Sequence, residues 1–448
     1  MEGGGMRRTV VALAALMLLA GACTAGGGTG QSPPPTVNPS ATHEPVTIEI
    51  WGAWSGRELK QFNQIFPAFE EKYPWITVKS VGNRDDEAIV AAIRAGNPPD
   101  VVLSFGLDSV GEFCSSGGWQ DLTPYIEQSN FDLSQFPESV FKYTSFAGSQ
   151  CALPFLTDAY GLYYNVDLFE KAGLTEPPKT FSELTEYAKK LTEFNPDGSI
   201  KVAGFIPWAG FYEFGAVTLS IPWQAHWYDE SGQHSAVATD PRWKEALQWQ
   251  KDLVDFYGAD ELKRFVAGLG GEWGAGHAFH HGQIAMMIDG EWRTAFIQDL
   301  APDLNYATAP FPVPDDAVDR YGMGQIGGTI IGIPRGSPHP AEAWLLVSWM
   351  ATDTDTLVYM ANNVRNVPTT YAALESPDLD VTPQFKTFLD IFQNPYSHYK
   401  ETSAIGSQDQ DLMGAFMEDW QEGKVPDLQA GLDQVAQQID ALLAQTQV

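Results

Sequence analysis

The sequence predicts an α/β fold that is divided into two lobes, and three observations lead to this prediction. Short β-branched segments alternate with segments whose apolar residues recur at helical spacing, which is the pattern of a mainly parallel sheet covered by helices. One run of this pattern ends before Cys151, and a second begins at Leu162. The chain has 448 residues, enough for two or three domains, and 44% of them are hydrophobic.

The first residues have the pattern of an export signal. Arg7–Arg8 are followed by an apolar stretch, Val10–Ala20, that is too short to cross a bilayer as a mature helix. The small residues before Cys23 are similar to a bacterial lipobox, and an ordinary signal peptide is the alternative. We expect a lipoprotein signal at residues 1–22, a disordered tether rich in Gly, Ser, Thr and Pro at residues 23–45, and a lipid on Cys23 that anchors the protein to the outer face of the membrane.

The first lobe is expected to begin with a strand at Val46–Trp51, where β-branched residues alternate with others. Ser55 and Glu58 have the spacing of a capping box, and apolar residues recur at helical spacing as far as Tyr73. The pattern then predicts a strand at Ile76–Val81, a helix at Glu87–Ala95, a strand at Asp100–Ser104 and a helix that begins at Asp108.

The segment Cys151–Asn165 is where we expect the chain to cross between the lobes. A proline, a carboxylate and a glycine interrupt its apolar pattern, and Leu162–Asn165 is predicted to be the first strand of the second lobe. Clefts between lobes are concave and are natural sites for small molecules. A carboxylate and an aromatic ring at this crossing, Asp158 and Tyr160, therefore predict a binding site.

The elements of the second lobe follow from caps, turns and apolar spacing. In chain order, we expect a helix opened by Thr180–Glu183 and running to about Phe194, a turn at Asn195–Gly198, a strand at Val202–Trp208, a helix capped by Asp240, a loop at Gly268–Gly276, strands at Gln283–Ile288 and Gly328–Ile333, and helices at Pro340–Met350 and Val425–Leu443.

Charge and cysteine content add two expectations. The formal net charge of −31 makes nucleic acid an unlikely partner, because phosphate binding requires a basic face. Besides Cys23 the chain has two cysteines, Cys114 and Cys151. In an exported protein an even pair predicts a disulfide, and two buried thiols are the alternative.

An ordered set of motifs resembles the family 1 extracellular solute-binding proteins of ABC sugar importers, which are maltose-binding-protein-like lipoproteins. The motifs follow the family's order over nearly all of the mature chain. They are the lipobox, Ile48–Trp51, Ala95–Val101, Gly161–Asn165, Ala172–Leu174, Pro177–Phe181, Phe279–Met286, Asp289–Trp292, Ala309–Pro312, Gly327–Gly328 and Asn366–Pro368.

The resemblance implies a two-lobed periplasmic-binding-protein fold of type II with discontinuous lobes. The first lobe would comprise residues 46–156 and 324–368, and the second would comprise residues 157–323 and 369–448. Hinge crossings would fall near Leu156–Tyr160, Met323–Gly328 and Val367–Tyr371. The protein would be a monomer without catalysis or cofactor that captures a sugar, of di- or oligosaccharide length, and delivers it to the transmembrane subunits of an ABC permease.

A sugar site needs aromatic rings for the faces of the sugar and polar groups for its hydroxyls. Trp54 and Phe105 follow strand ends, and Trp292 occupies the family's Gly-x-Trp position. We expect the ligand-binding residues to be Trp54, Phe105, Asp158, Tyr160, Trp208, Trp223, Trp273, Trp292, Gly327, Gly328 and Arg365.

Each of these residues also has a structural interpretation. Trp54 and Phe105 fit the core as well as a cleft, and Asp158 could cap a hinge. The pair Gly327–Gly328 could be a plain hinge rather than a source of backbone N–H groups. Arg365 could form an ion pair instead of binding a hydroxyl.

Several other patterns in the sequence compete with the sugar-binding interpretation. His277, His280 and His281 suggest a metal site, but the pattern supplies no Glu or Cys ligand, and we expect no metal. The loop Gly268–Gly276 lacks the Gly-Lys-Ser/Thr of a phosphate loop, and no Gly-x-Ser-x-Gly motif is present. Two alternatives remain: a secreted glycoside hydrolase, or the same fold binding a polyol, a glycerophosphodiester or a peptide.

Overall fold

The computed structural model describes residues 37–38 and 41–446, all within one compact unit, Pro34–Val448. The predicted signal peptide, Cys23 and most of the predicted tether lie outside the described residues. None of the helices in residues 41–446 combines the length and the apolar character that a membrane crossing requires.

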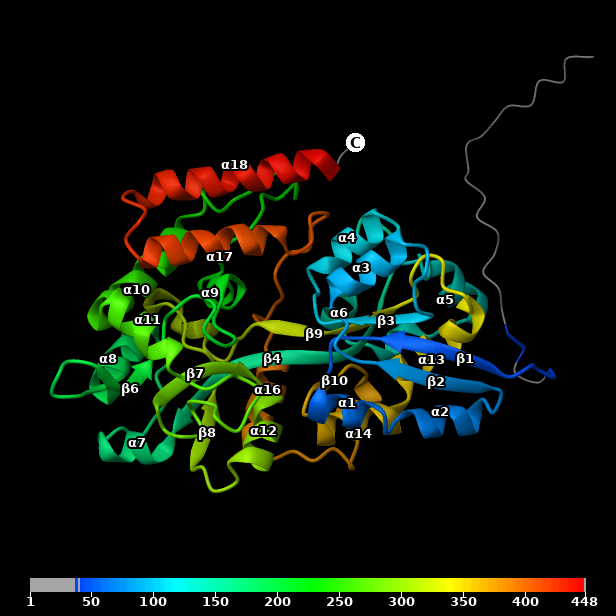
Figure 1. Ribbon diagram of the computed structural model, residues 1–448, viewed down its shortest axis with the longest axis horizontal. Coiled ribbons are helices and arrows are strands. Elements are labelled where there is room, and N and C mark those ends of the chain that lie inside the picture. Colours follow the sequence, from blue (N-terminus) through cyan, green and yellow to red (C-terminus); the bar gives the residue numbers. More distant parts are fainter. Residues whose placement is uncertain (1–36, 39–40, 447–448) are drawn as a thin grey trace, which may run out of the picture. The chain divides into compact units, whose positions relative to one another are not determined.

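A ten-stranded mixed sheet organises these residues (Figure 1). The strands β1, β2 and β3 are parallel, and β9 joins them in the antiparallel direction. The order across the sheet is β2 (Ile76–Val81), β1 (Val46–Trp51), β3 (Val101–Ser104), β9 (Ile326–Gly332), β4 (Leu153–Asn165), β7 (Ile284–Gly290), β6 (Ile200–Phe205) and β5 (Glu193–Phe194), with β8 (Tyr306–Ala309) and β10 (Val367–Pro368) also paired to β4.

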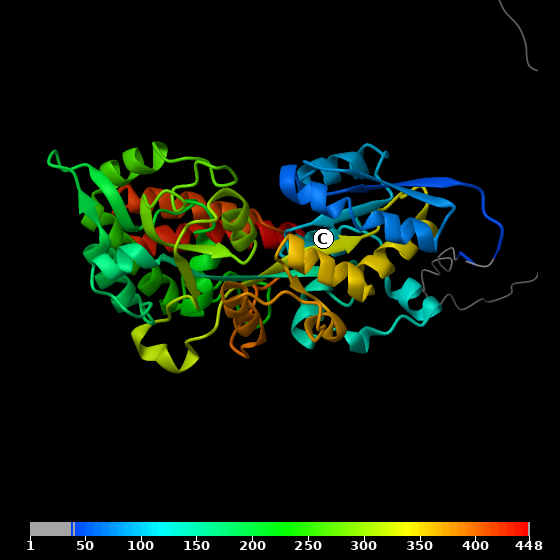
Figure 2. The same cartoon turned by 90° about the horizontal axis from the view of Figure 1, so that it is seen from below.

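The strand β4 links the two halves of this sheet. Its residues 153–159 pair with β9, and its residues 160–164 pair with β7. Both views show β4 running from one group of helices into the other (Figure 1, Figure 2). The predicted crossing agrees with this change of partner at residues 159–160. Pro154 does not break the strand, because it lies where the register with β9 shifts, which is a usual place for proline in a strand.

Helices surround each half of the sheet (Figure 1). Around β1–β3 lie α1 (Gly56–Phe62), α2 (Phe66–Lys72), α3 (Asp86–Arg94), α4 (Ser109–Ser115), α5 (Thr123–Ser129), α6 (Glu138–Phe141), α13 (Pro340–Thr352) and α14 (Thr354–Asn363). The remaining helices are α7 (Val166–Lys171), α8 (Phe181–Leu191), α9 (Ala216–Trp223), α10 (Pro241–Tyr257), α11 (Ala259–Ala267), α12 (Arg293–Leu300), α15 (Tyr371–Leu374), α16 (Pro383–Gln393), α17 (Gln408–Gln421) and α18 (Leu428–Thr446).

Most predicted elements are confirmed within a few residues, and the differences have local causes. The apolar stripe up to Tyr73 forms two helices, because Pro67 at the start of α2 has no N–H to continue α1. Ser55 precedes α1 but makes no side-chain cap, so the predicted capping box is wrong. The strand predicted at Val202–Trp208 ends at Phe205, shortly before Pro207.

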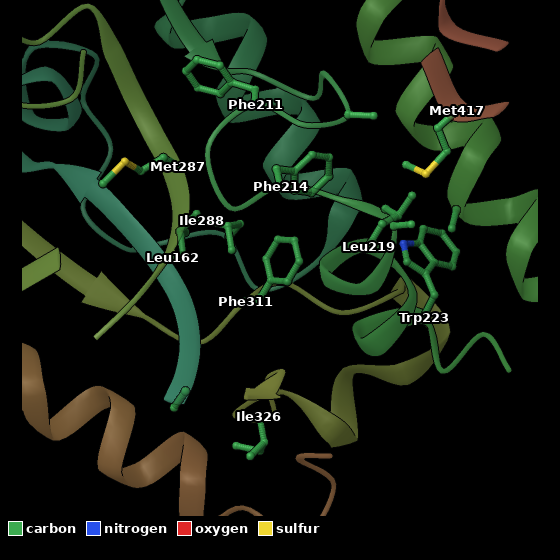
Figure 3. Close-up of a cluster of buried hydrophobic side chains, with 14 of the residues drawn as sticks. Leu162, Phe211, Phe214, Leu219, Trp223, Met287, Ile288, Phe311, Ile326 and Met417 are labelled. Atoms are coloured by element: carbon green, nitrogen blue, oxygen red, sulfur yellow. The ribbon is translucent and has the colours of Figure 1, made fainter. Parts of the chain in front are cut away.

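A large apolar cluster lies against β4, β7 and β9 (Figure 3). Figure 3 labels ten residues of this cluster, which come from strands, helices and loops: Leu162, Phe211, Phe214, Leu219, Trp223, Met287, Ile288, Phe311, Ile326 and Met417. Because Leu162 and Ile326 belong to the two strands that meet at the lobe junction, the same packing that stabilises the second lobe also fixes the junction.

The structure joins Cys114 of α4 to Cys151, just before β4, with Cα atoms 5.5 Å apart. The predicted pairing of the two cysteines thus agrees with the structure. The bond closes a loop with a sequence separation of 37 and ties a helix of the first lobe to the strand that links the lobes.

We expect the double variant Cys114→Ser/Cys151→Ser to lose about 3 to 4 kcal/mol of unfolding free energy, because the unfolded chain regains the entropy of an open loop. Denaturant titration monitored by tryptophan fluorescence measures this loss. The reduced wild-type protein should match the double variant, and an unchanged unfolding midpoint in both would contradict the prediction.

Candidate functional site

Two adjoining cavities lie at the lobe junction. Their volumes are about 520 Å³ and about 320 Å³, and Phe105, Tyr160 and Glu213 line both. These volumes are typical of small-molecule sites. The larger cavity is lined by residues 53–58 after β1, by β4 and by α12, so its walls come from both lobes.

Seven of the predicted residues line these cavities. In the larger cavity the tryptophans differ in exposure: the Trp273 side chain is 52% exposed, whereas Trp54 and Trp292 are almost fully buried. The residues lining the larger cavity are Trp54, Phe105, Asp158, Tyr160, Trp273 and Trp292, and Gly327 lines the smaller one.

Four predicted residues lie outside both cavities. Trp208 is buried in the core, and Trp223 stacks on Phe181 with ring centroids 4.8 Å apart. No residue with a side chain fits at Gly328, because a Cβ atom there would come within 2.7 Å of the Leu156 carbonyl oxygen. Arg365 donates to Asp380 at 2.6 Å. It therefore forms an ion pair, which is the alternative to binding a sugar hydroxyl. For these four residues a packing or ion-pair role corrects the expectation of a cleft position.

A buried polar network forms the floor of the larger cavity. Asn366 Nδ2 donates to Asp158 Oδ1 at 2.5 Å and to Glu291 Oε1 at 3.2 Å. The backbone N–H of Ala159 donates to Glu291 Oε2 at 2.7 Å. The network therefore ties β4 to the residue after β7 and to the segment before β10, and one of its carboxyl groups, that of Asp158, faces the cavity.

Burial controls the protonation of this network. Desolvation raises the pKa of Asp158 to about 7. The hydrogen bond from Asn366 and the hydrogen bond with Glu291 act in the opposite direction and lower it. Desolvation and then the charge of Asp158 raise the pKa of Glu291 well above its usual range. Two carboxylates in contact inside a protein do not both ionise readily, so the pair holds a proton near neutral pH.

Aromatic rings form the walls above this floor. Tyr160 and Trp292 meet edge to face with centroids 5.3 Å apart, and the Trp292 Nε1 atom has no hydrogen-bond partner among the described residues. Trp273 lies 5.5 Å from Phe296 of α12. The cavity thus offers apolar ring faces, and the indole N–H of Trp292 lies covered within its wall.

An ion pair forms part of the wall of the larger cavity. Arg57 of α1 donates from Nε to Asp299 Oδ2 of α12 at 2.5 Å, and its guanidinium lies 5.9 Å from the centroid of Phe296. Both partners line the cavity and both are partly exposed to solvent. The pair therefore joins the first lobe to the second beside the site.

A cluster of carboxylates adjoins the cavities and could hold a cation. One oxygen of each of Glu213, Glu272 and Asp289 lies within 4.8 Å of the others. Arg293 is buried beside them, and its Nε donates to Asp289 Oδ2 at 2.6 Å. Because a guanidinium already supplies positive charge there, the geometry does not require a metal.

The three histidines do not form such a cluster. His277 and His280 are buried with ring centroids 4.6 Å apart, and His277 also stacks on Tyr212. Desolvation, followed by the charge of Arg293, lowers the pKa of His277 to about 2 and that of His280 to about 4, so both rings are neutral near pH 7. Within the described residues no third ligand side chain meets them.

The smaller cavity ends at a second contact between the lobes. Gln410 of α17 donates from Nε2 to Asp108 Oδ2 at 2.5 Å. Close by, Gly111 of α4 packs so tightly that a Cβ would overlap the carbonyl group of Ser403. Lys400, which also lines this cavity, pairs with Asp409 at 2.8 Å.

Several residues that line the larger cavity are not among the predicted ligand-binding residues. Glu58 has capping-box spacing but instead faces the cavity, and burial raises its pKa to about 7. Arg57, Glu213 and Asn366 also line the larger cavity. Of these, only Asn366 lies in a motif that the sequence made visible, directly after Arg365.

Comparison with known proteins agrees with this geometry. The family described as bacterial extracellular solute-binding protein matches residues 53–356, more than half of the chain. The chain belongs to this family. Its membership places the solute-binding protein outside the cytoplasm.

Named relatives and solved structures share most of the length of this solute-binding protein. The maltotriose-binding protein of Pyrococcus abyssi (strain GE5 / Orsay) is 22% identical over 88% of this chain and 81% of its own length. The structure of CpMnBP1 with mannobiose bound has a TM-score of 0.79 and 25% identity over 89% of this chain and 99% of its own. The same protein with mannotriose bound has a TM-score of 0.77 and 26% identity over 89% and 100%.

The buried carboxyl pair predicts an unusual pH dependence of stability. Folding raises the pKa of Asp158 from 3.8 to about 7, so the stability that this group contributes is present below pH 3.8 and is lost as the pH rises to about 7. Asparagine does not titrate. We therefore expect Asp158→Asn to be more stable than wild type at pH 8 by on the order of 1 to 3 kcal/mol, an advantage that shrinks toward pH 4.

Thermal unfolding from pH 4 to pH 8 measures the effect. The control is Asp319→Asn, at an exposed carboxylate outside the cavities, which should follow wild type at every pH. A variant Asp158→Asn that is less stable than wild type at pH 8 would show that the ionised carboxylate is instead stabilised by its surroundings.

Proposed function

We propose that this chain is the sugar-binding lipoprotein of an ABC importer and that it binds a di- or oligosaccharide in the larger cavity and its smaller neighbour. The observation that carries the proposal is the cavity lining. Aromatic rings from both lobes surround a buried carboxyl and amide network. Ring faces suit the C–H faces of a sugar, and the network suits its hydroxyl groups.

Three of the similar proteins and structures support a sugar as the ligand. The matched protein of Pyrococcus abyssi is named for maltotriose, and the similar solved structures hold mannobiose and mannotriose. Two cavities that share Phe105, Tyr160 and Glu213 offer an elongated space, which fits a ligand of more than one sugar unit. We assign Trp54, Phe105, Asp158, Tyr160, Trp273, Trp292 and Gly327 to this ligand.

Capture would use closure of two lobes. We assign residues 46–156 and 324–368 to the first lobe and residues 157–323 and 369–448 to the second. Three segments cross between these lobes, in β4, β9 and β10, and their paired backbones would act as the hinge. A lipid on Cys23 would hold the monomer at the membrane, beside the permease subunits that receive the sugar.

The proposal assigns no catalysis and no metal to the chain. The glycoside hydrolase alternative remains a matter for experiment, and release of reducing sugar from a bound oligosaccharide would favour it. A phosphate-bearing ligand fits poorly, since Arg57, the only cation that lines the larger cavity among the described residues, is already paired with Asp299.

Calorimetric titration with mono-, di- and trisaccharides of the gluco and manno series tests the assignment. We expect at least one oligosaccharide to bind without being hydrolysed. If none of these sugars binds, the sugar assignment is wrong.

The contribution of the aromatic wall can be tested separately. Trp273→Ala should weaken binding of the best sugar by about 1 kcal/mol or more, roughly fivefold, because an exposed stacking face is lost. Phe194→Ala removes a similarly exposed ring from β5, outside the cavities, and serves as the matched control. Equal affinities of the two variants would remove Trp273 from the site.

A further inference from the structure

The larger cavity carries more negative than positive groups. Four carboxyl side chains line it, those of Glu58, Asp158, Glu213 and Asp299, against the single guanidinium of Arg57. Arg57 is paired with Asp299 at 2.5 Å. The other three carboxyl groups make no ion pair with a cationic side chain of the described residues.

The layer behind these groups does not restore the balance. Glu291, Glu272 and Asp289 lie there, and Arg293 is the cation among them, committed to Asp289 at 2.6 Å. Grouping buried carboxylates without counter-charges is unfavourable. In agreement, desolvation and neighbouring carboxylates raise the pKa of Glu213, and desolvation and Asp158 raise that of Glu58 to about 7.

A second, independent observation is an unused acceptor at the cavity wall. Asn366 is only 5% exposed and lines the cavity. Its Nδ2 donates to Asp158 and Glu291, which fixes the orientation of the amide, and its Oδ1 receives no hydrogen bond within the described residues. The Glu58 carboxyl group likewise has no hydrogen bond there. Asn366 Oδ1 is covered by neighbouring atoms, whereas the Glu58 carboxyl group is partly exposed and can accept from a donor that a ligand brings.

Donors at the same wall define the rest of the ligand. Trp292 Nε1 and Arg57 Nη1 lack hydrogen-bond partners in the part of the chain that the structure describes and are covered by neighbouring atoms, so they would reach hydroxyl oxygens after a small shift of the wall. The rings of Trp273 and Trp292 can face both sugar C–H groups and a cation. An ammonium group supplies three N–H donors and one positive charge, which is what the acidic wall lacks.

We propose that the preferred ligand is an amino sugar, a saccharide whose protonated amine lies against Glu58, Asp158 and Asn366 while its hydroxyl groups meet Trp292 and Arg57. This inference rests on the proposed sugar-binding function and narrows its substrate class. The same charge distribution disfavours uronic acids and sugar phosphates.

Matched β-1,4-linked disaccharides test the proposal by calorimetry at pH 7: the glucosamine dimer, its N-acetylated form and cellobiose, with glucosamine, mannosamine, glucose and mannose as single units. We expect each amine to bind at least about tenfold more tightly than its neutral counterparts. Glu58→Gln should reduce this preference severalfold, and Glu71→Gln, at an exposed position of α2, should leave it unchanged.

Three results would overturn the proposal. Neutral sugars that bind as well as their amines would refute it while leaving sugar binding intact. An amine preference that persists in both Glu58→Gln and Asp158→Asn would show that the charge lies elsewhere. Absence of binding by every sugar, including the neutral gluco and manno oligosaccharides, would remove the underlying function as well.

Discussion

The carboxyl groups of Asp158 and Glu291 are buried together at the point where β4, the end of β7 and the segment before β10 meet. Such a pair is tolerated only if hydrogen bonds and a shared proton offset the loss of hydration. The Ala159 N–H and the Asn366 amide supply those bonds, so the three segments must pass one another in one arrangement. This arrangement also sets the position of Tyr160. The buried polar groups form the floor of the cavity, where they are available to a ligand.

Much of the fold could be predicted from periodicity alone. The strands β1 and β2 have the predicted bounds because β-branched residues mark them clearly. Helix α9 was not predicted because it is buried on nearly all sides and contains Pro222, so it has no polar face to give it a helical period. In β4, proline and glycine interrupt the apolar pattern, and pairing on both edges keeps the strand continuous through them.

The sequence signal for the site is clearest where a polar residue interrupts an apolar strand. Asp158 and Tyr160 stand out in this way. For a tryptophan, the sequence does not distinguish a core position from a cavity position. Trp208 and Trp273 both lie near glycine-containing loops, yet Trp208 is buried in the core and Trp273 is half exposed in the cavity. Tertiary packing decides between them. Glu213 was invisible for the same reason, since a carboxylate in a loop is usually solvated.

The contacts at the two ends of the cavities are mechanically unequal. At one end the backbones of Gly111 and Ser403 pack directly against each other. No flexible side chain lies between them, so this contact is rigid. At the other end Arg57 and Asp299 meet through flexible, partly exposed side chains whose attraction is weak and is screened by salt. If the lobes move about the hinge in β4, β9 and β10, the Arg57 end would therefore separate more readily than the Gly111 end. The ionic strength outside the cell would then influence how quickly solute enters and leaves, even where it hardly changes how tightly solute is held.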